Sequence, residues 1–104
     1  MPQYRLLRQA QRHIDEIREH TVRQWGLAQA KDYFDGMKMA FELLAANPSV
    51  GKNRDEDLKP GVLSFVYKSH IIYYRSTPQD IVIVGVMHHG MDHRRHFAKR
   101  FVDL

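Results

Sequence analysis

Four side chains that could support acid–base catalysis stand at the ends of two apolar runs. They are His70, Arg75, His88 and His89. Histidine titrates near neutral pH and can accept or donate a proton, and arginine can stabilise charge that develops on a phosphate during RNA cleavage. A structural interpretation is also open, in which His70 is a polar strand-end residue and His88 ties the last strand to the following helix through Asp92. The residues favour the structural interpretation.

A second set of imidazoles raises the question of a metal site. His89 and His93 are spaced i, i+4, and His93 and His96 are spaced i, i+3, so one helical face could present them. The segment HGMDH lacks the glutamate of the helical zinc-protease motif. Structural zinc sites usually use thiolates, and the chain has no cysteine. We therefore expect no metal and no other cofactor.

Two amphipathic helices must support these residues. Between Gln9 and Trp25 the apolar stripe is Ala10, Ile14, Ile17, Thr21 and Trp25, with Arg, Glu and His on the other faces. From 28 to 46 the stripe is Ala30, Tyr33, Phe34, Met37, Phe41 and Leu44. Gly26 allows the first helix to end in a tight turn, and Pro48 stops the second. The pattern predicts an antiparallel helical hairpin.

The second half of the chain has the composition of a small sheet. A polar, turn-rich loop is predicted at 49–61, and three runs rich in Val, Ile and Tyr follow at 62–68, 70–76 and 80–88. Their short connections predict an antiparallel meander, with the almost wholly apolar last strand in a central position. Gly85 suggests a bulge or a close backbone approach in that strand. A further short strand is predicted at 3–7, and a basic helix at 91–104 with Phe97 and Phe101 on one face.

The element order predicts an α+β fold in a single domain that covers residues 1–104. The order is β-α-α-β-β-β with a short C-terminal helix, and the helical hairpin should lie across one face of a curved antiparallel sheet. Trp25, Phe34 and Phe41 should join the Ile and Val residues of the sheet in one core. Truncating Trp25 or Phe41 to alanine should then cost about 3–5 kcal/mol.

Length and charge limit the classes of function. A chain of 104 residues has room for one domain, and its 43% hydrophobic and 27% charged residues are typical of a globular protein. No apolar run has the length of a signal peptide or a membrane span, so we expect a cytoplasmic protein. The net charge of +4 favours an acidic partner, either nucleic acid or protein, although it can also serve solubility alone. We favour a protein partner, because the basic tail HRRHFAKR offers no platform for base stacking.

Several short motifs, taken in their order and spacing, resemble one family. They are Trp25-Gly26 with Gln29-Ala30 and Tyr33, Pro48 with Gly51, Pro60-Gly61, Ser69-His70 with Tyr74-Arg75, and His88 with Met91-Asp92. With the segments around them they resemble the ParE toxins of type II toxin–antitoxin modules, in the RelE/ParE superfamily. The resemblance covers nearly the whole chain. The fold it implies agrees with the element order that the patterning predicts.

The resemblance implies a toxin that inhibits DNA gyrase by protein–protein binding and has no catalytic residues. It implies a ParD-type antitoxin, whose disordered tail folds around the toxin, and contact with operator DNA only through that antitoxin. Candidate partner-binding residues are Tyr4, Tyr73, Arg94, Arg95, Lys99 and Arg100.

Two other functions remain open at this point. A RelE-like endoribonuclease that cleaves mRNA on the ribosome would use the four residues named first, but toxins of that branch typically carry a late tyrosine, and this chain has none after Arg75. A non-toxic member would act only in a repressor complex. Similar proteins commonly have an arginine two residues after Pro-Gly, where this chain has Leu63. A gyrase contact made by that arginine would be missing here.

Overall fold

The computed structural model describes residues 3–100, apart from the side chains of His96 and of 98–100. Its helices are α1 (Arg8–Trp25), α2 (Leu27–Ala46), the 3-10 turn η1 (Pro48–Val50) and α3 (His93–Arg100). Its strands are β1 (Tyr4–Leu6), β2 (Lys52–Asn53), β3 (Leu63–Tyr67), β4 (His70–Ser76) and β5 (Ile81–His88). The predicted α+β class and element order are confirmed, and Phe101 lies outside the described residues.

The strands form one sheet in the order β1-β5-β4-β3-β2. The strand β1 runs parallel to β5, and the other neighbours are antiparallel. The central position predicted for the last strand is confirmed, because β5 lies between β1 and β4. The predicted loop at 49–61 is partly wrong, since it contains η1 and β2. The short β2 is held in part by a hydrogen bond just beyond it, from the Arg54 N–H to the Val62 carbonyl at 2.9 Å.

A bulge in β5 allows this strand to place side chains in two separate hydrophobic clusters. Tyr73 lies opposite Gly85 and Tyr74 lies opposite Ile83, so Val84 is an extra residue in the ladder. Side chains alternate along a strand, so Ile83 and Val86 would face opposite sides without that extra residue. With it, both side chains face the helical hairpin. Of the two features that Gly85 suggested, the bulge is confirmed, with the extra residue next to the glycine.

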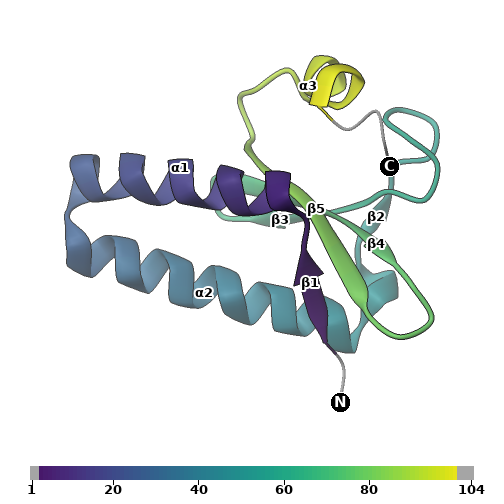
Figure 1. The fold of residues 1–104 in the computed structure, drawn as a ribbon, viewed down its shortest axis with the longest axis horizontal. Coiled ribbons are helices and arrows are strands. Elements are labelled where there is room, and N and C mark those ends of the chain that lie inside the picture. The colour runs from purple at the N-terminus through teal and green to yellow at the C-terminus, as the bar shows by residue number, and fades with distance from the viewer. Residues whose placement is uncertain (1–2, 101–104) are drawn as a thin grey trace.

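The helices cover the sheet from two sides (Figure 1). The hairpin of α1 and α2 packs on one face, where the core includes Ile14, Phe41, Leu44 and Ile83. A second cluster, which includes Val62, Tyr73, Val84, Met87 and Phe97, joins α3 to the sheet. The described helices include none that is both long enough and apolar enough to span a membrane.

Three predictions about burial are wrong. Trp25 was expected in the core but is 66% exposed, because the ends of α1 and α2 extend past the sheet (Figure 1). Tyr73 was expected to contact a partner but is 1% exposed, within the second cluster. His13 was assigned to an outer face of its helix but is 7% exposed. The prediction that Phe41 belongs to the core is confirmed.

Candidate functional site

The antiparallel register of β4 and β5 brings three of the four candidate histidine and arginine side chains together. His70 lies opposite His88 in the ladder, and their ring centroids are 5.5 Å apart in an edge-on arrangement. The ring of His89 stacks on His88 at 4.4 Å. These three imidazoles form a histidine cluster at one end of the sheet.

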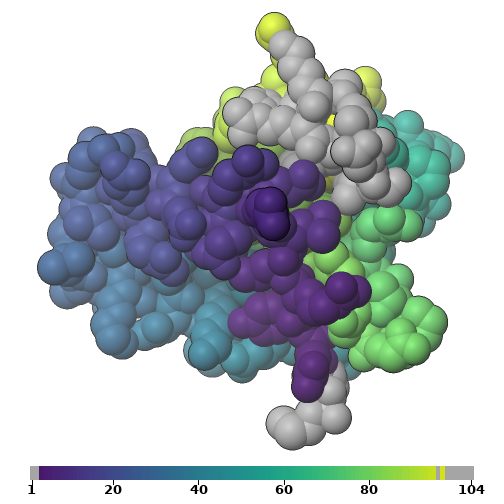
Figure 2. Space-filling view, viewed as in Figure 1, coloured from purple at the N-terminus to yellow at the C-terminus, as the bar shows by residue number. Residues whose placement is uncertain are grey.

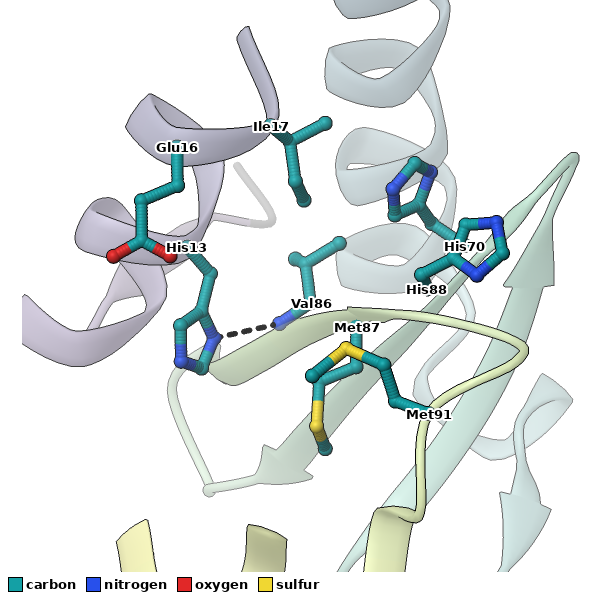
Figure 3. Close-up of a pocket in the computed structure, with 8 residues that line it drawn as sticks. All are labelled: His13, Glu16, Ile17, His70, Val86, Met87, His88 and Met91. Atoms are coloured by element: carbon teal, nitrogen blue, oxygen red, sulfur yellow. Dashed lines mark hydrogen bonds between the residues drawn. The ribbon is translucent and has the colours of Figure 1, made fainter. Parts of the chain in front are cut away.

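A small cavity of about 110 Å³ adjoins this cluster, between α1 and β5. His13 lies on the α1 side and accepts a hydrogen bond on Nδ1 from the Val86 N–H at 3.2 Å. In Figure 3 the side chains of Ile17 and Val86 lie between His13 and the pair of His70 and His88. The imidazoles that line this cavity therefore do not converge on one point.

His70 is held by a tyrosine of α2. The Tyr33 hydroxyl lies 2.7 Å from His70 Nδ1. Burial, together with His88, His89 and His20, lowers the pKa of His70 to about 4. Burial also raises the pKa of Tyr33, which keeps its hydroxyl protonated. With its pKa lowered, His70 is neutral near pH 7, and its Nδ1 is occupied by the hydrogen bond with the Tyr33 hydroxyl.

The lowered pKa of His70 predicts a loss of stability in acid. An unfolded histidine has a pKa near 6.5. Between pH 6.5 and 4 the unfolded state therefore binds a proton at His70, whereas the folded state does not. The free energy of unfolding should therefore fall as the pH drops through this window. Thermal melts across it should show a weaker pH dependence for His70→Gln, which cannot titrate. An NMR titration midpoint for His70 near 6.5 would contradict this prediction.

Arg75 is not part of the histidine cluster. It is exposed near the other end of β4, opposite Val82. It lies five positions along the strand from His70, which corresponds to roughly 17 Å. A ribonuclease centre would need the cation beside the phosphate that the histidines act on. The structure thus brings His70, His88 and His89 together and leaves Arg75 apart.

The junction of β5 and α3 differs from the one predicted. His88 accepts a hydrogen bond on Nδ1 from the Gly90 N–H at 3.1 Å, and Asp92 accepts the Arg95 N–H at 3.2 Å as a cap of α3. The tie between strand and helix is made by His93, whose Nε2 lies 2.8 Å from the His88 carbonyl oxygen and whose Nδ1 contacts the Tyr73 hydroxyl. The predicted link from His88 to Asp92 is replaced by these contacts.

Other motif residues hold turns and helix contacts. The Tyr74 hydroxyl donates to the Pro48 carbonyl at 2.7 Å and accepts the Gly51 N–H at 2.9 Å, which fastens η1 to the sheet. Gly61 has a φ of +84°, a region that favours glycine. The Ser69 carbonyl accepts the His89 N–H at 3.0 Å. These residues shape the fold without forming a reaction centre.

Apart from the buried Tyr73, the candidate partner-binding residues fall into three groups. Tyr4 is half-buried, stacks at a tilt on Phe41 with centroids 5.3 Å apart, and lines a hollow of about 240 Å³ together with residues of α1 and α2. Arg94 and Arg95 are exposed on α3. The side chains of Lys99 and Arg100 lie outside the described part of the chain.

Leu63 occupies the position where similar proteins commonly have arginine. It is half-buried and packs against the core beneath the helical hairpin. In the register it pairs with Tyr74 on one side and Asn53 on the other. The leucine therefore has a packing role at this position.

The part of the chain that the structure describes contains no set of side chains arranged to bind a metal ion. No group of three or more His, Cys, Asp or Glu residues is placed there to hold an ion. The side chain of His96, one of the imidazoles considered for such a site, is not among those described.

His13 is the site residue that the sequence interpretation missed. Its position carries a signal, because it follows Ala10 by three residues and precedes Ile17 by four, which places it on the buried stripe. Polarity alone assigned it to the outside. Its burial is compatible with polarity because its Nδ1 satisfies the Val86 N–H beside the bulge.

The family model and the curated relatives that match this chain are all described as ParE toxins. Residues 4–93 match the family model described as "ParE toxin of type II toxin-antitoxin system, parDE". "Toxin ParE1" of Caulobacter vibrioides is 33% identical over 98 residues, covering 94% of this chain and 100% of that protein. "Toxin ParE1" of Mycobacterium tuberculosis is 37% identical over 90 residues, covering 86% of this chain and 91% of that protein.

A solved structure has the same fold. It is described as "Chromosomal ParDE TA system from P. aeruginosa", and it superimposes with a TM-score of 0.72 over 85% of this chain and 96% of that one. The sequence identity is 20%. This likeness therefore concerns the fold alone.

Proposed function

Because this chain belongs to the ParE toxin family of type II toxin–antitoxin systems, we propose that it inhibits DNA gyrase by binding to it. It acts without catalysing a reaction, in the cytoplasm, and a ParD-type antitoxin neutralises it. Family membership over residues 4–93 is the observation that carries this proposal.

The geometry of the histidine cluster supports a mechanism without catalysis. A ribonuclease needs a proton acceptor, a proton donor and a cation around one phosphate. Here Nδ1 of His70 is engaged by Tyr33, and Arg75 lies roughly 17 Å along the strand from the cluster. Binding to a protein surface requires no such convergence, so the site fits a binder better than a nuclease.

The antitoxin is proposed to wrap the toxin with a segment that folds on binding. The hollow beside Tyr4 offers apolar side chains of α1 and α2 together with the cations Arg18 and Lys38, which outnumber the one carboxylate in its lining, Asp35. This lining suits an amphipathic segment that carries acidic residues. Arg94 and Arg95 on α3 add positive charge for the same partner. Operator DNA is reached only through the antitoxin.

A supercoiling assay tests this proposal directly. We expect the purified protein to block supercoiling by bacterial gyrase, and the antitoxin to restore it. Primer extension on cellular mRNA after induction should show intact transcripts. The double variant His70→Ala, His88→Ala should keep most of its inhibition if folding survives, whereas a nuclease would lose orders of magnitude in rate.

The remaining outcomes separate the other functions. Codon-linked cuts in mRNA, lost in the double variant, would replace the proposal with a ribosome-dependent endoribonuclease. Normal supercoiling, intact mRNA and no growth arrest would point to a member that acts only in a repressor complex.

A further inference from the structure

The connection between α1 and α2 presents two large apolar side chains to solvent. Trp25 is 66% exposed and Leu27 is 77% exposed, on either side of Gly26. We define residues 24–29, all of which are exposed, as the hairpin tip. Tryptophan is usually well buried in a folded protein, and exposed apolar patches mark interaction sites. We propose that the hairpin tip anchors this protein in an apolar pocket of a folded target.

The hairpin tip carries no charge, although 27% of the chain is charged. Its sequence is QWGLAQ. The charged residues beside it are neutralised within their own helices: Arg23 pairs with Glu19 at 3.1 Å, and Lys31 pairs with Asp35 at 2.8 Å. A neutral surface of this kind complements an uncharged apolar pocket. It has nothing to offer an acidic peptide or the phosphates of a nucleic acid.

The backbone holds the hairpin tip in a fixed shape. Gly26 is the only residue between the two helices, and its φ of +89° is a conformation that favours glycine. Its N–H donates to the Val22 carbonyl at 2.9 Å, and its carbonyl accepts the Ala30 N–H at 3.1 Å. Both helices are therefore hydrogen-bonded up to the turn. A preorganised anchor of this kind loses little conformational entropy on binding.

The shape of this region decides between the partners. The hairpin tip forms one end of the molecule, away from the sheet, and projects at the left edge of the surface (Figures 1 and 2). A projecting knob needs a preformed concave pocket, which a folded protein can supply and a disordered tail cannot. Under the proposed function, on which this inference rests, that folded protein is gyrase. The antitoxin then binds elsewhere, in the hollow beside Tyr4.

Trp25→Ala tests this assignment in the full chain. Buried aromatic anchors at interfaces often cost 2 kcal/mol or more when truncated, so the concentration for half-inhibition of gyrase should rise by about 30-fold. Trp25→Phe keeps an aromatic ring and should recover part of this loss. Antitoxin affinity and melting temperature should stay unchanged, because Trp25 contributes little to the core.

Met39→Ala is the matched control, because Met39 is 69% exposed on α2 but lies outside the hairpin tip. It should inhibit gyrase as the unsubstituted protein does. Equal inhibition by Trp25→Ala would overturn this inference and leave the proposed function standing. A parallel loss of antitoxin binding would also overturn it, since the tip would then serve the antitoxin. An unsubstituted protein that does not inhibit gyrase would overturn both.

Discussion

Replacing Phe41 with alanine is expected to lower the free energy of unfolding by about 3–5 kcal/mol. The ring is 4% exposed and packs between α2 and the sheet, where Tyr4 lies 5.3 Å away between centroids. Truncation removes the buried ring and leaves a cavity that the surrounding helix and strands cannot fill. Domains of this size have about 5–15 kcal/mol in total, so the variant should be close to unfolding.

Urea denaturation followed by circular dichroism measures this loss. Trp25→Ala is the control of similar size, and the same measurement should place it within about 0.5 kcal/mol of the unsubstituted protein, since the tryptophan is 66% exposed. The sequence interpretation assigned both residues the same cost. Equal losses for the two variants would show that the hairpin tip is packed in solution.

Gly51→Ala is expected to destabilise the protein by about 3 kcal/mol. A β-carbon at Gly51 would lie 2.2 Å from the Tyr74 hydroxyl oxygen and 2.8 Å from two carbons of the ring. Tyr74 is fully buried and cannot swing aside. The chain at Gly51 must therefore move away. The hydroxyl then loses the Gly51 N–H and strains its bond to the Pro48 carbonyl.

The backbone of Gly51 is itself compatible with alanine, because its φ of −70° and ψ of 159° are extended. Without the close contact the substitution would stabilise by about 0.4–1 kcal/mol through the unfolded state. A double-mutant cycle with Tyr74→Phe isolates the contact. The double variant should lose less than the two single variants together, because both disrupt the same hydroxyl contacts. A neutral or stabilising Gly51→Ala would refute the close packing.

The periodicity of the sequence determined the elements and their order. Apolar spacings of three and four gave α1 and α2, and the Val-, Ile- and Tyr-rich runs gave β3, β4 and β5. These signals are local, because each depends on residues within one element. The bulge at Gly85 was predictable for the same reason, since glycine within a strand marks an irregular ladder.

Burial at element ends was not predictable in this way. Trp25 and Ile17 share a helical stripe, yet only Ile17 packs against the core, because the sheet does not extend beneath the end of α1. Helical spacing fixes which face a residue occupies and carries no information on where the opposing surface stops. Tyr73 was misassigned as an aromatic side chain left over from the core, and His13 because its polarity suggested solvent. Partners distant in sequence satisfy the polar atoms of both.

For the candidate functional site, too, part could be predicted from local sequence and part depended on the tertiary structure. The sequence identified His70, Arg75, His88 and His89 as the residues with suitable chemistry. Only the pairing of β4 with β5 decided that the three histidines meet and that Arg75 stands apart. The chemistry that a side chain can perform depends on its residue type, which is known at each position without any knowledge of the fold. Convergence depends on strand register, which is set by contacts between residues far apart in sequence.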